Sequence, residues 1–361
     1  MNRCQSAAKR LSLKWMSGFI WTGIFLAGAL QAQEAEPPLL EKARQWFKPL
    51  PGSMATPEFP ATSAQIALGR QLFFDPRLSL DGTVSCATCH RPALYGTDAL
   101  PKSIGIEHRL SARNAPTVLN AALQFKIHWT GDRANVEEQA TKSLTGHASF
   151  GNPDPASVIR KLQALGYTPG FERAFPNETK TIKPENWGKA IGAYERTLLT
   201  PAPFDAYLKG DGQALSPQAK DGLKAFIEIG CVSCHNGVGV GGSSFQKFGI
   251  FKEYWKHTGS RTIDEGRFTA TQDPADKYVF KVPSLRNVAM TPPYFHDGSV
   301  ATLPQAIRVM GKIQLGKMLS DQEVRNLTAF LNNLTGEQPA NFVSEPVLMP
   351  QAFSPSPAKG N

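Results

Sequence analysis

Near the end of the chain, apolar residues recur at three- and four-residue intervals over residues 320–334. The members of this stripe are Val324, Leu327, Leu331 and Leu334. Because an α-helix turns once in 3.6 residues, this spacing places them on one face. Ser320 and Glu323 precede the stripe with the spacing of a capping box, in which each side chain satisfies a free backbone N–H of the first turn. The pattern predicts a helix that begins after Ser320 and packs through one apolar face.

Two earlier segments each have a glycine followed four residues later by a phenylalanine. The pairs are Gly69 with Phe73 and Gly222 with Phe226. At this spacing the two side chains share one face of a helix, so both segments predict helices with a similar packing face. Candidate residues for the starts of these helices are Ser63, Ser216 and Pro217. The repetition predicts a mainly helical chain with two similar halves.

The first 32 residues have the pattern of an export signal. Residues 1–14 hold four basic residues and no acidic one, and the apolar run of residues 15–30 follows. This order is typical of a secretory signal peptide, and the run is short for a membrane span. We predict that residues 1–32 direct export to a bacterial periplasm and are then removed. An N-terminal anchor that stays uncleaved is the alternative.

Composition divides the remainder of the chain. Its length is enough for two domains, each with its own core. Residues 201–214 have the proline and glycine content of a linker, which separates a domain at residues 33–200 from one at residues 215–336. Residues 337–361 end in a Pro/Ser-rich segment that predicts a disordered tail.

The distribution of charged residues argues against a nucleic-acid partner. The chain has 39 Lys and Arg residues against 30 Asp and Glu residues, a formal charge of +9. Four of the basic residues belong to the predicted signal peptide. No dense run of Lys and Arg interleaved with aromatic residues occurs, so we expect no nucleic-acid partner.

Four of the five cysteines belong to a repeated motif. Cys4 lies in the predicted signal peptide, and the others form Cys-x-x-Cys-His at residues 86–90 and again at residues 231–235. On one helical turn the two sulfurs and the imidazole point to the same side. Two thiols so placed can add to the two vinyl groups of a haem, and the histidine can bind its iron.

Zinc, a redox dithiol and a disulfide are the alternatives for these cysteines. Zinc would need two further ligands near each motif, and no suitably spaced Cys/His pair occurs. A redox dithiol gives no reason for a histidine directly after the second cysteine, twice. We therefore predict a mainly α protein with two cytochrome c-like helical domains, each enclosing one covalently attached haem. The predicted haem-binding residues are Cys86, Cys89, His90, Cys231, Cys234 and His235.

Beyond the two motifs, the chain resembles the bacterial di-haem cytochrome c peroxidases, a group that also contains the MauG-type enzymes. The resemblance covers about residues 60–335. The shared stretches, in order, are "LGRQLFFDPRLS", "SCATCH", "RNAPTVLNAA", "HWTGDRA", "EEQA", "FDAYLKGD", "GCVSCHNG", "KVPSLRNVAMTPPYFHDGS" and "VMGKIQLGK".

The resemblance implies that the haem of His235 receives electrons and that Met310 is its second axial ligand. Thioether ligation raises the reduction potential and leaves the iron closed to peroxide. MauG-type members have a tyrosine in place of this methionine, so Met310 favours the peroxidase branch.

The haem of His90 is implied to be the one that reacts with peroxide. Many family peroxidases cap it in the resting state with a histidine after Ser-x-Gly. Here Ile106 has that position, and His108 follows two residues later. Isoleucine cannot bind iron, so either the iron is open on this side or the loop shifts to bring His108 in.

Further reaction residues are implied by the same resemblance. Trp129 matches a tryptophan that lies between the two haems, and Gln139 matches a glutamine that can hydrogen-bond peroxide. The family glutamate ten residues after that glutamine is replaced by Ser149, which cannot supply a proton at a useful pKa. Histidine side chains in general take up and release protons near neutral pH, and we expect His147 to substitute; an ordinary surface-loop histidine is the alternative.

A calcium site is also implied. The side-chain oxygen of Asn114 and the backbone carbonyls of Thr291 and Pro293 match a family site between the domains, and oxygen ligands suit this hard cation. We expect a structural role for His296, which follows in the same loop.

These features predict an exported di-haem peroxidase that reduces hydrogen peroxide to water. Electrons from a small periplasmic donor, such as a cytochrome c or a cupredoxin, would enter at the haem of His235 and pass Trp129 to the haem of His90. A MauG-like enzyme that oxidises residues of a partner protein is the first alternative, and a non-catalytic di-haem electron carrier is the second. A homodimer is left open.

Haem content tests the interpretation of the motifs. Because each pair of cysteines tethers its own haem, pyridine haemochrome analysis of the purified protein should give two covalent c-type haems per chain. A ratio near one, or haem that acidified solvent extracts, would contradict the prediction.

Overall fold

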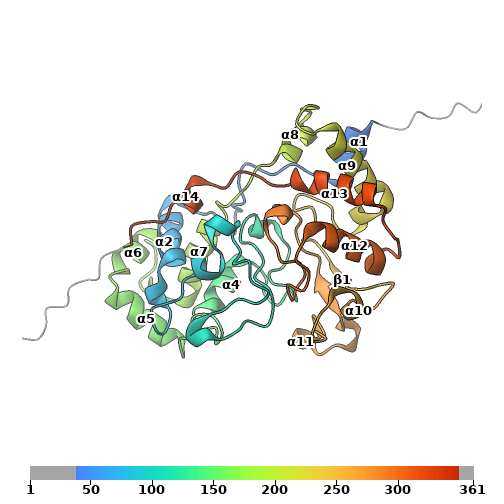
Figure 1. Ribbon diagram of the computed structural model, residues 1–361. Helices are drawn as coiled ribbons and strands as arrows, with labels where there is room; N and C mark the ends of the chain where they lie inside the picture. The colour runs from blue at the N-terminus through green and yellow to red at the C-terminus, as the bar shows by residue number, and fades with distance from the viewer. Residues whose placement is uncertain (1–37, 349–361) are drawn as a thin grey trace, which may run out of the picture. The chain divides into compact units, whose positions relative to one another are not determined.

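Helices dominate residues 38–348, the part of the chain that the computed structural model describes (Figure 1). The α-helices of this part are α1 Leu39–Trp46, α2 Ser63–Phe74, α3 Cys86–Cys89, α4 Val136–Ser143, α5 Pro155–Ala164, α6 Thr168–Ala174, α7 Pro184–Glu195, α8 Pro203–Lys209, α9 Pro217–Ile229, α10 Trp255–Thr258, α11 Phe268–Thr271, α12 Leu303–Gln314, α13 Asp321–Asn332 and α14 Ala340–Val343. The predicted mainly α class is confirmed for the described residues.

Short 3-10 helices and one small sheet complete the secondary structure of the described part. The 3-10 helices are η1 Pro76–Leu78, η2 Pro92–Leu94, η3 Ile106–His108, η4 Ala121–Leu123, η5 Cys231–Ser233, η6 Pro274–Asp276 and η7 Val288–Met290. The strands β1 Phe245–Lys247 and β2 Val279–Lys281 pair antiparallel, with Phe245 opposite Lys281.

Helices α2 and α7 cross at a glycine. A Cβ atom on Gly69 would lie only 1.8 Å from the carbonyl oxygen of Ala190, so a larger residue cannot be accommodated at this approach. One turn further along α2, the ring of Phe73 contacts the ring of Tyr194 edge to face, with 5.4 Å between centroids. The glycine brings the helices together, and the aromatic pair fills the space beside the crossing.

Helices α9 and α13 repeat this arrangement. A Cβ atom on Gly222 would lie 1.9 Å from the carbonyl oxygen of Asn326. Phe226, one turn later, packs against Phe330 with 5.3 Å between ring centroids. The glycine–phenylalanine repeat of the sequence therefore corresponds to the same helix crossing in both pairs.

The helix starts agree with the predicted caps at two of three places. The capping box of Ser320 and Glu323 is present, and the hydroxyl of Ser216 accepts from the backbone N–H of Ala219 at 3.2 Å. Helix α2, however, is capped by Thr62 and not by Ser63. Thr62 and Gln65 form a capping box, and that reciprocal pair of bonds moves the helix start by one residue.

Two large clusters of buried apolar side chains lie in the described residues, with a third, small one formed by Ala121, Ile127 and Val136. The first collects residues of α2 and of α4 to α7, and the second collects residues of α1, α8, α9, α12 and α13. Two short segments pack away from their sequence neighbours. Ala43 of α1 belongs to the second cluster, whereas Phe342 of α14 belongs to the first, with its ring centroid 6.2 Å from that of Phe73. The ribbon of α14 accordingly lies close to that of α2 (Figure 1).

Two predicted irregular segments contain helices. The predicted linker at residues 201–214 includes α8, whose Phe204 is fully buried. The predicted tail at residues 337–361 begins with a segment that includes α14 and buries Phe342 completely, so this part of the tail is ordered by a core contact. Residues 349–361 and the predicted signal peptide lie outside the described residues.

None of the helices in residues 38–348 has both the length and the apolar character that a membrane crossing requires.

The glycine crossing gives a stability prediction. Gly222→Ala should lower the free energy of unfolding by about 1–3 kcal/mol or more, because the added methyl group forces α9 away from α13. Urea unfolding of the haem-loaded protein measures the change. Gly212→Ala is the matched control, since a Cβ there meets nothing within 4 Å. Equal losses in the two variants would contradict the role of the crossing.

Candidate haem-binding sites

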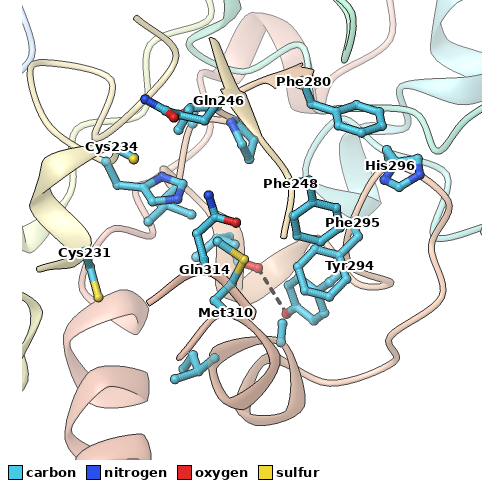
Figure 2. A pocket seen from close by; sticks show the side chains of 18 of the residues that line it. Cys231, Cys234, Gln246, Phe248, Phe280, Tyr294, Phe295, His296, Met310 and Gln314 are labelled. Atoms are coloured by element: carbon cyan, nitrogen blue, oxygen red, sulfur yellow. Dashed lines mark hydrogen bonds between the residues drawn. The ribbon is translucent and has the colours of Figure 1, made fainter. Parts of the chain in front are cut away.

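A cavity of about 250 Å³ lies beside the second Cys-x-x-Cys-His motif. Cys231, Cys234 and His235 line it together with Met310 from α12. Figure 2 shows the two cysteines on one wall and several aromatic side chains on the opposite wall, with Met310 between them. The structure therefore brings the four residues predicted for the second haem to one enclosed space.

The local backbone explains why the motif faces this cavity. Helix α9 ends at Gly230, whose φ of 104° lies in the left-handed region that favours glycine. The chain turns there and η5 begins at once with Cys231. The backbone N–H of His235 donates to the carbonyl of Cys231 at 3.0 Å, so the thiols and the imidazole share one short turn.

His235 has the surroundings of a buried metal ligand. Burial lowers the pKa of its imidazole to about 4, so the ring is neutral at neutral pH, which is the form that binds metals. The Nδ1 atom is buried without a hydrogen-bond partner among the described residues. A Cβ on Gly241 would lie only 3.0 Å from that atom, so the absence of a side chain at Gly241 avoids a steric clash with the imidazole of His235. These features fit a haem iron ligand.

Lys281 is a cavity residue that the sequence did not single out. Its side chain is buried, donates to the amide oxygen of Gln124, and forms no ion pair among the described residues. Burial lowers the pKa of its ammonium group to about 8. A carboxylate-bearing group in the cavity, such as a haem, would supply the missing counter-charge. The available signal was a lysine within an apolar segment, between Phe280 and Val282.

The first motif has a comparable local geometry. Helix α3 holds both cysteines, and the backbone N–H of His90 donates to the carbonyl of Cys86 at 2.9 Å. The ring atom Nδ1 of His90 lies 3.0 Å from the carbonyl oxygen of Gly96. Because a carbonyl only accepts, Nδ1 bears the proton and Nε2 keeps its lone pair for a metal. The cysteines of both motifs are free thiols, as haem attachment requires.

Trp129 lies at the cavity of the second motif. It lines the cavity of His235, and its Nε1 donates to the backbone carbonyl of Asn114 at 2.9 Å. The preceding residue, His128, is close enough to His90 to influence it. Burial chiefly, and the charge of His128 in addition, lower the pKa of His90. Both residues of the segment line the cavity of the second motif, and the charge of His128 also acts on His90 of the first.

The residues predicted for acid–base catalysis are more exposed to solvent than His235. Gln139 is half-buried in α4, and His147 is exposed in the loop that follows. Arg109 donates to the backbone carbonyl of His147 at 3.0 Å, which ties down the backbone and leaves the imidazole at the surface. The hydroxyl of Ser149 donates to the carbonyl of Ser143 at 3.0 Å and holds the turn.

The neighbouring loop, which contains Ile106 and His108, buries the side chain of its isoleucine. Ile106 is fully buried, and its backbone N–H donates to the carbonyl of Ser149 at 3.1 Å. A Cβ on Gly151 would come within 2.9 Å of the Ile106 side chain, so the two loops are in tight contact. His108 is exposed. Moving His108 inward would therefore require the Ile106 packing to break.

The three residues predicted for calcium line the same cavity as Met310. They are Asn114, Thr291 and Pro293. The side-chain amide of Asn114 donates to the carbonyl of Leu100 at 2.8 Å. Among residues 38–348 no group of three or more His, Cys, Asp or Glu side chains could hold a metal, so a cation here would depend on amide and carbonyl oxygens. His296 is buried and stacks on Phe280, 4.4 Å between ring centroids.

Two pairs of free thiols, each followed by a histidine whose pKa is lowered by burial, and two similar helix crossings are the features expected of a protein that binds two c-type haems. The family model of the di-haem cytochrome c peroxidases matches residues 63–213. The cytochrome c551 peroxidase of Pseudomonas aeruginosa is 42% identical over 306 residues, 83% of this chain and 87% of that protein. The chain belongs to the di-haem cytochrome c peroxidase family.

Two further relatives come from the MauG branch. The methylamine utilization protein MauG of Methylorubrum extorquens is 34% identical and covers 78% of this chain and 81% of its own. A solved MauG-like protein associated with microbial copper homeostasis is 28% identical, with a TM-score of 0.72 over 83% of this chain and 97% of that chain. The family thus spans two activities, and the site residues must discriminate between them.

Met310 gives a test of the second site. If its sulfur binds iron, Met310→His should lower the potential of that haem by on the order of 0.1 V, because axial ligands set haem potentials over a wide span. Redox titration followed by the haem absorption measures the shift. Met318→His is the control, since Met318 is 82% exposed in the segment after α12. An unchanged potential in Met310→His would return Met310 to a packing role.

Proposed function

We propose that the protein is a periplasmic peroxidase that reduces hydrogen peroxide to water with two covalently bound haems and electrons from a small donor protein. The observation that supports this most directly is the cavity that Met310 shares with His235 and the second pair of thiols. A methionine in this place suits a haem that passes electrons on. The chain's family membership agrees, as does its 42% identity to a cytochrome c551 peroxidase.

The overall reaction takes one hydrogen peroxide, two electrons and two protons and yields two waters. A bound haem supplies an iron that exchanges single electrons, and an iron with an open position can also bind peroxide. The chain's own residues then have distinct tasks at the two sites. His90 would hold the first haem, with its orientation fixed by the carbonyl of Gly96, and His235 with Met310 would hold the second.

Trp129 supports an electron path between the two sites. Its indole lies in the cavity of His235 and is fixed by its bond to Asn114. Its neighbour His128 lies near His90. We propose that this fixed aromatic ring shortens the path of an electron from the second haem to the first.

His147, with help from Gln139, is proposed to move the peroxide protons. Ser149 stands where family peroxidases have a glutamate, and its hydroxyl is already bonded to two backbone carbonyls. The imidazole of His147 makes no side-chain hydrogen bond among the described residues, so it is free to turn toward a substrate. We also propose a calcium ion at Asn114, Thr291 and Pro293.

The MauG-like alternative is not favoured. A methionine stands at the position where that branch has a tyrosine, and it lines the cavity together with His235. A non-catalytic carrier, the second alternative, would transfer electrons without reacting with peroxide. The assay that separates these functions is the peroxide-dependent oxidation of a reduced small cytochrome c by the purified, haem-loaded protein. Oxidation at many turnovers per enzyme supports the peroxidase, and its absence contradicts it.

His147→Ala should lower the rate of reaction with peroxide by about 10²-fold, because general acid–base catalysis contributes roughly 10²–10⁴-fold. Stopped-flow absorption of the haem bands measures this rate. His257→Ala is the control, since His257 belongs to α10 and to neither motif. A wild-type rate in His147→Ala would show that another group moves the protons.

A further inference from the structure

Glu195, the last residue of α7, is a buried carboxyl group that no predicted role includes. It is only 5% exposed, and no hydrogen bond or ion pair to its carboxyl occurs among the described residues. The adjacent Arg196 instead binds Glu137 with two bonds, of 2.6 Å and 3.0 Å. Two buried acidic side chains therefore lie near a single arginine. The arginine pairs with Glu137, so Glu195 has no cation bonded to its carboxyl group.

Because two acidic side chains lie beside one arginine, Glu195 is favoured in its neutral, protonated form. Burial, and the negative charge of Glu137 in addition, raise the pKa of Glu195 to about 8, although Arg196 opposes the shift. The other titratable groups that interact with Glu195 are Tyr194 on the same helix and Cys86 on α3. None of them is a cation that could hold Glu195 ionised. The carboxyl is therefore protonated at neutral pH and close to its titration range.

The internal repeat shows where the carboxyl lies. Helix α7 crosses α2 at Ala190, and α13 crosses α9 at Asn326. Five residues after each crossing stand Glu195 and Leu331. Leu331 lines the cavity of the second motif. Glu195 has the equivalent place in the first half, and its electrostatic interaction with Cys86 agrees with a position beside the first motif.

We propose that Glu195 is a redox-linked proton-binding site for the haem of the first motif. Its carboxyl takes up a proton when that haem gains an electron and releases the proton when the haem loses it. This inference rests on the proposed function, because it requires haem at Cys86, Cys89 and His90. An electron added to the haem makes the surroundings of Glu195 more negative, and a neutral carboxyl is favoured there.

A second cavity provides a connection to solvent. It has a volume of about 270 Å³ and reaches Glu137, the carboxylate next to Glu195. The charged residues of its lining are Glu58, Glu137, Glu178 and Lys189. The proposed route for protons between solvent and Glu195 runs along this cavity and past Glu137. The overall reaction consumes two protons with its two electrons, so a group that binds a proton together with an electron keeps the buried site near neutral charge.

The test is a redox titration of the haem-loaded protein at a series of pH values from about 6 to about 10. In the wild type, the reduction equilibrium of the first-motif haem should become less favourable by up to tenfold per pH unit through the range near pH 8. That slope corresponds to about 59 mV for a one-electron couple. Glu195→Gln should lose this slope. It should match the wild type near pH 6, where both side chains are neutral, and have the higher potential near pH 10.

Two further variants separate a proton-binding role from a structural one. Glu195→Asp retains a titratable group and should retain a pH slope, whereas Glu172→Gln removes an exposed carboxylate of the same half and should leave the slope unchanged. Equal slopes in the wild type and Glu195→Gln would overturn the inference while the proposed function stands. A wild-type protein without haem at the first motif would contradict the proposed function, and this inference with it.

Discussion

The close approach of two helices at a single glycine is the constraint on which each half of the structure depends. At Gly69 and at Gly222 a backbone carbonyl of the partner helix occupies the space where any other residue would have a side chain. Helix α9 leads directly into the second motif, and α2 leads toward the first through η1. The partner helices α7 and α13 continue past the crossing and supply Glu195 and Leu331. The crossing thus sets the position of the thiols and of the facing wall together.

Buried ion pairs distinguish the two halves. In the second, Arg286 binds Asp205 through bonds of 3.0 Å and 2.9 Å, and the same carboxylate accepts from the backbone N–H of Leu50 at 2.7 Å. The charges of this group cancel, because one aspartate is paired with one arginine. In the first half, the pair of Arg196 and Glu137 has an additional carboxyl beside it. An unbalanced charge is costly to bury, which is why it points to chemistry and not to stability.

Local signals in the sequence predicted much of this arrangement. The short turns of the two motifs, the similar packing faces of the Gly/Phe helices and the cap at Ser320 each depend on residues a few positions apart, and the structure contains them. The haem-binding roles of the thiols and histidines stay predictions. Glu195 could not be found in this way, and for Lys281 the only local signal was its place between two apolar residues. Their significance lies in being buried without a counter-charge, and burial is decided by segments far away in the chain. The order of the segment around Phe342 depends likewise on a distant core.

The contact between α14 and the first core has a consequence for synthesis. Arg70 donates to the backbone carbonyl of Asn341 at 2.8 Å, across 271 positions of the chain. A ribosome adds residues from the N-terminal end, so nearly the whole polypeptide must emerge before this contact can form. Contacts between such distant residues form late, since the intervening chain must first be ordered. Until then the first core, against which Cys86 packs, lacks Phe342.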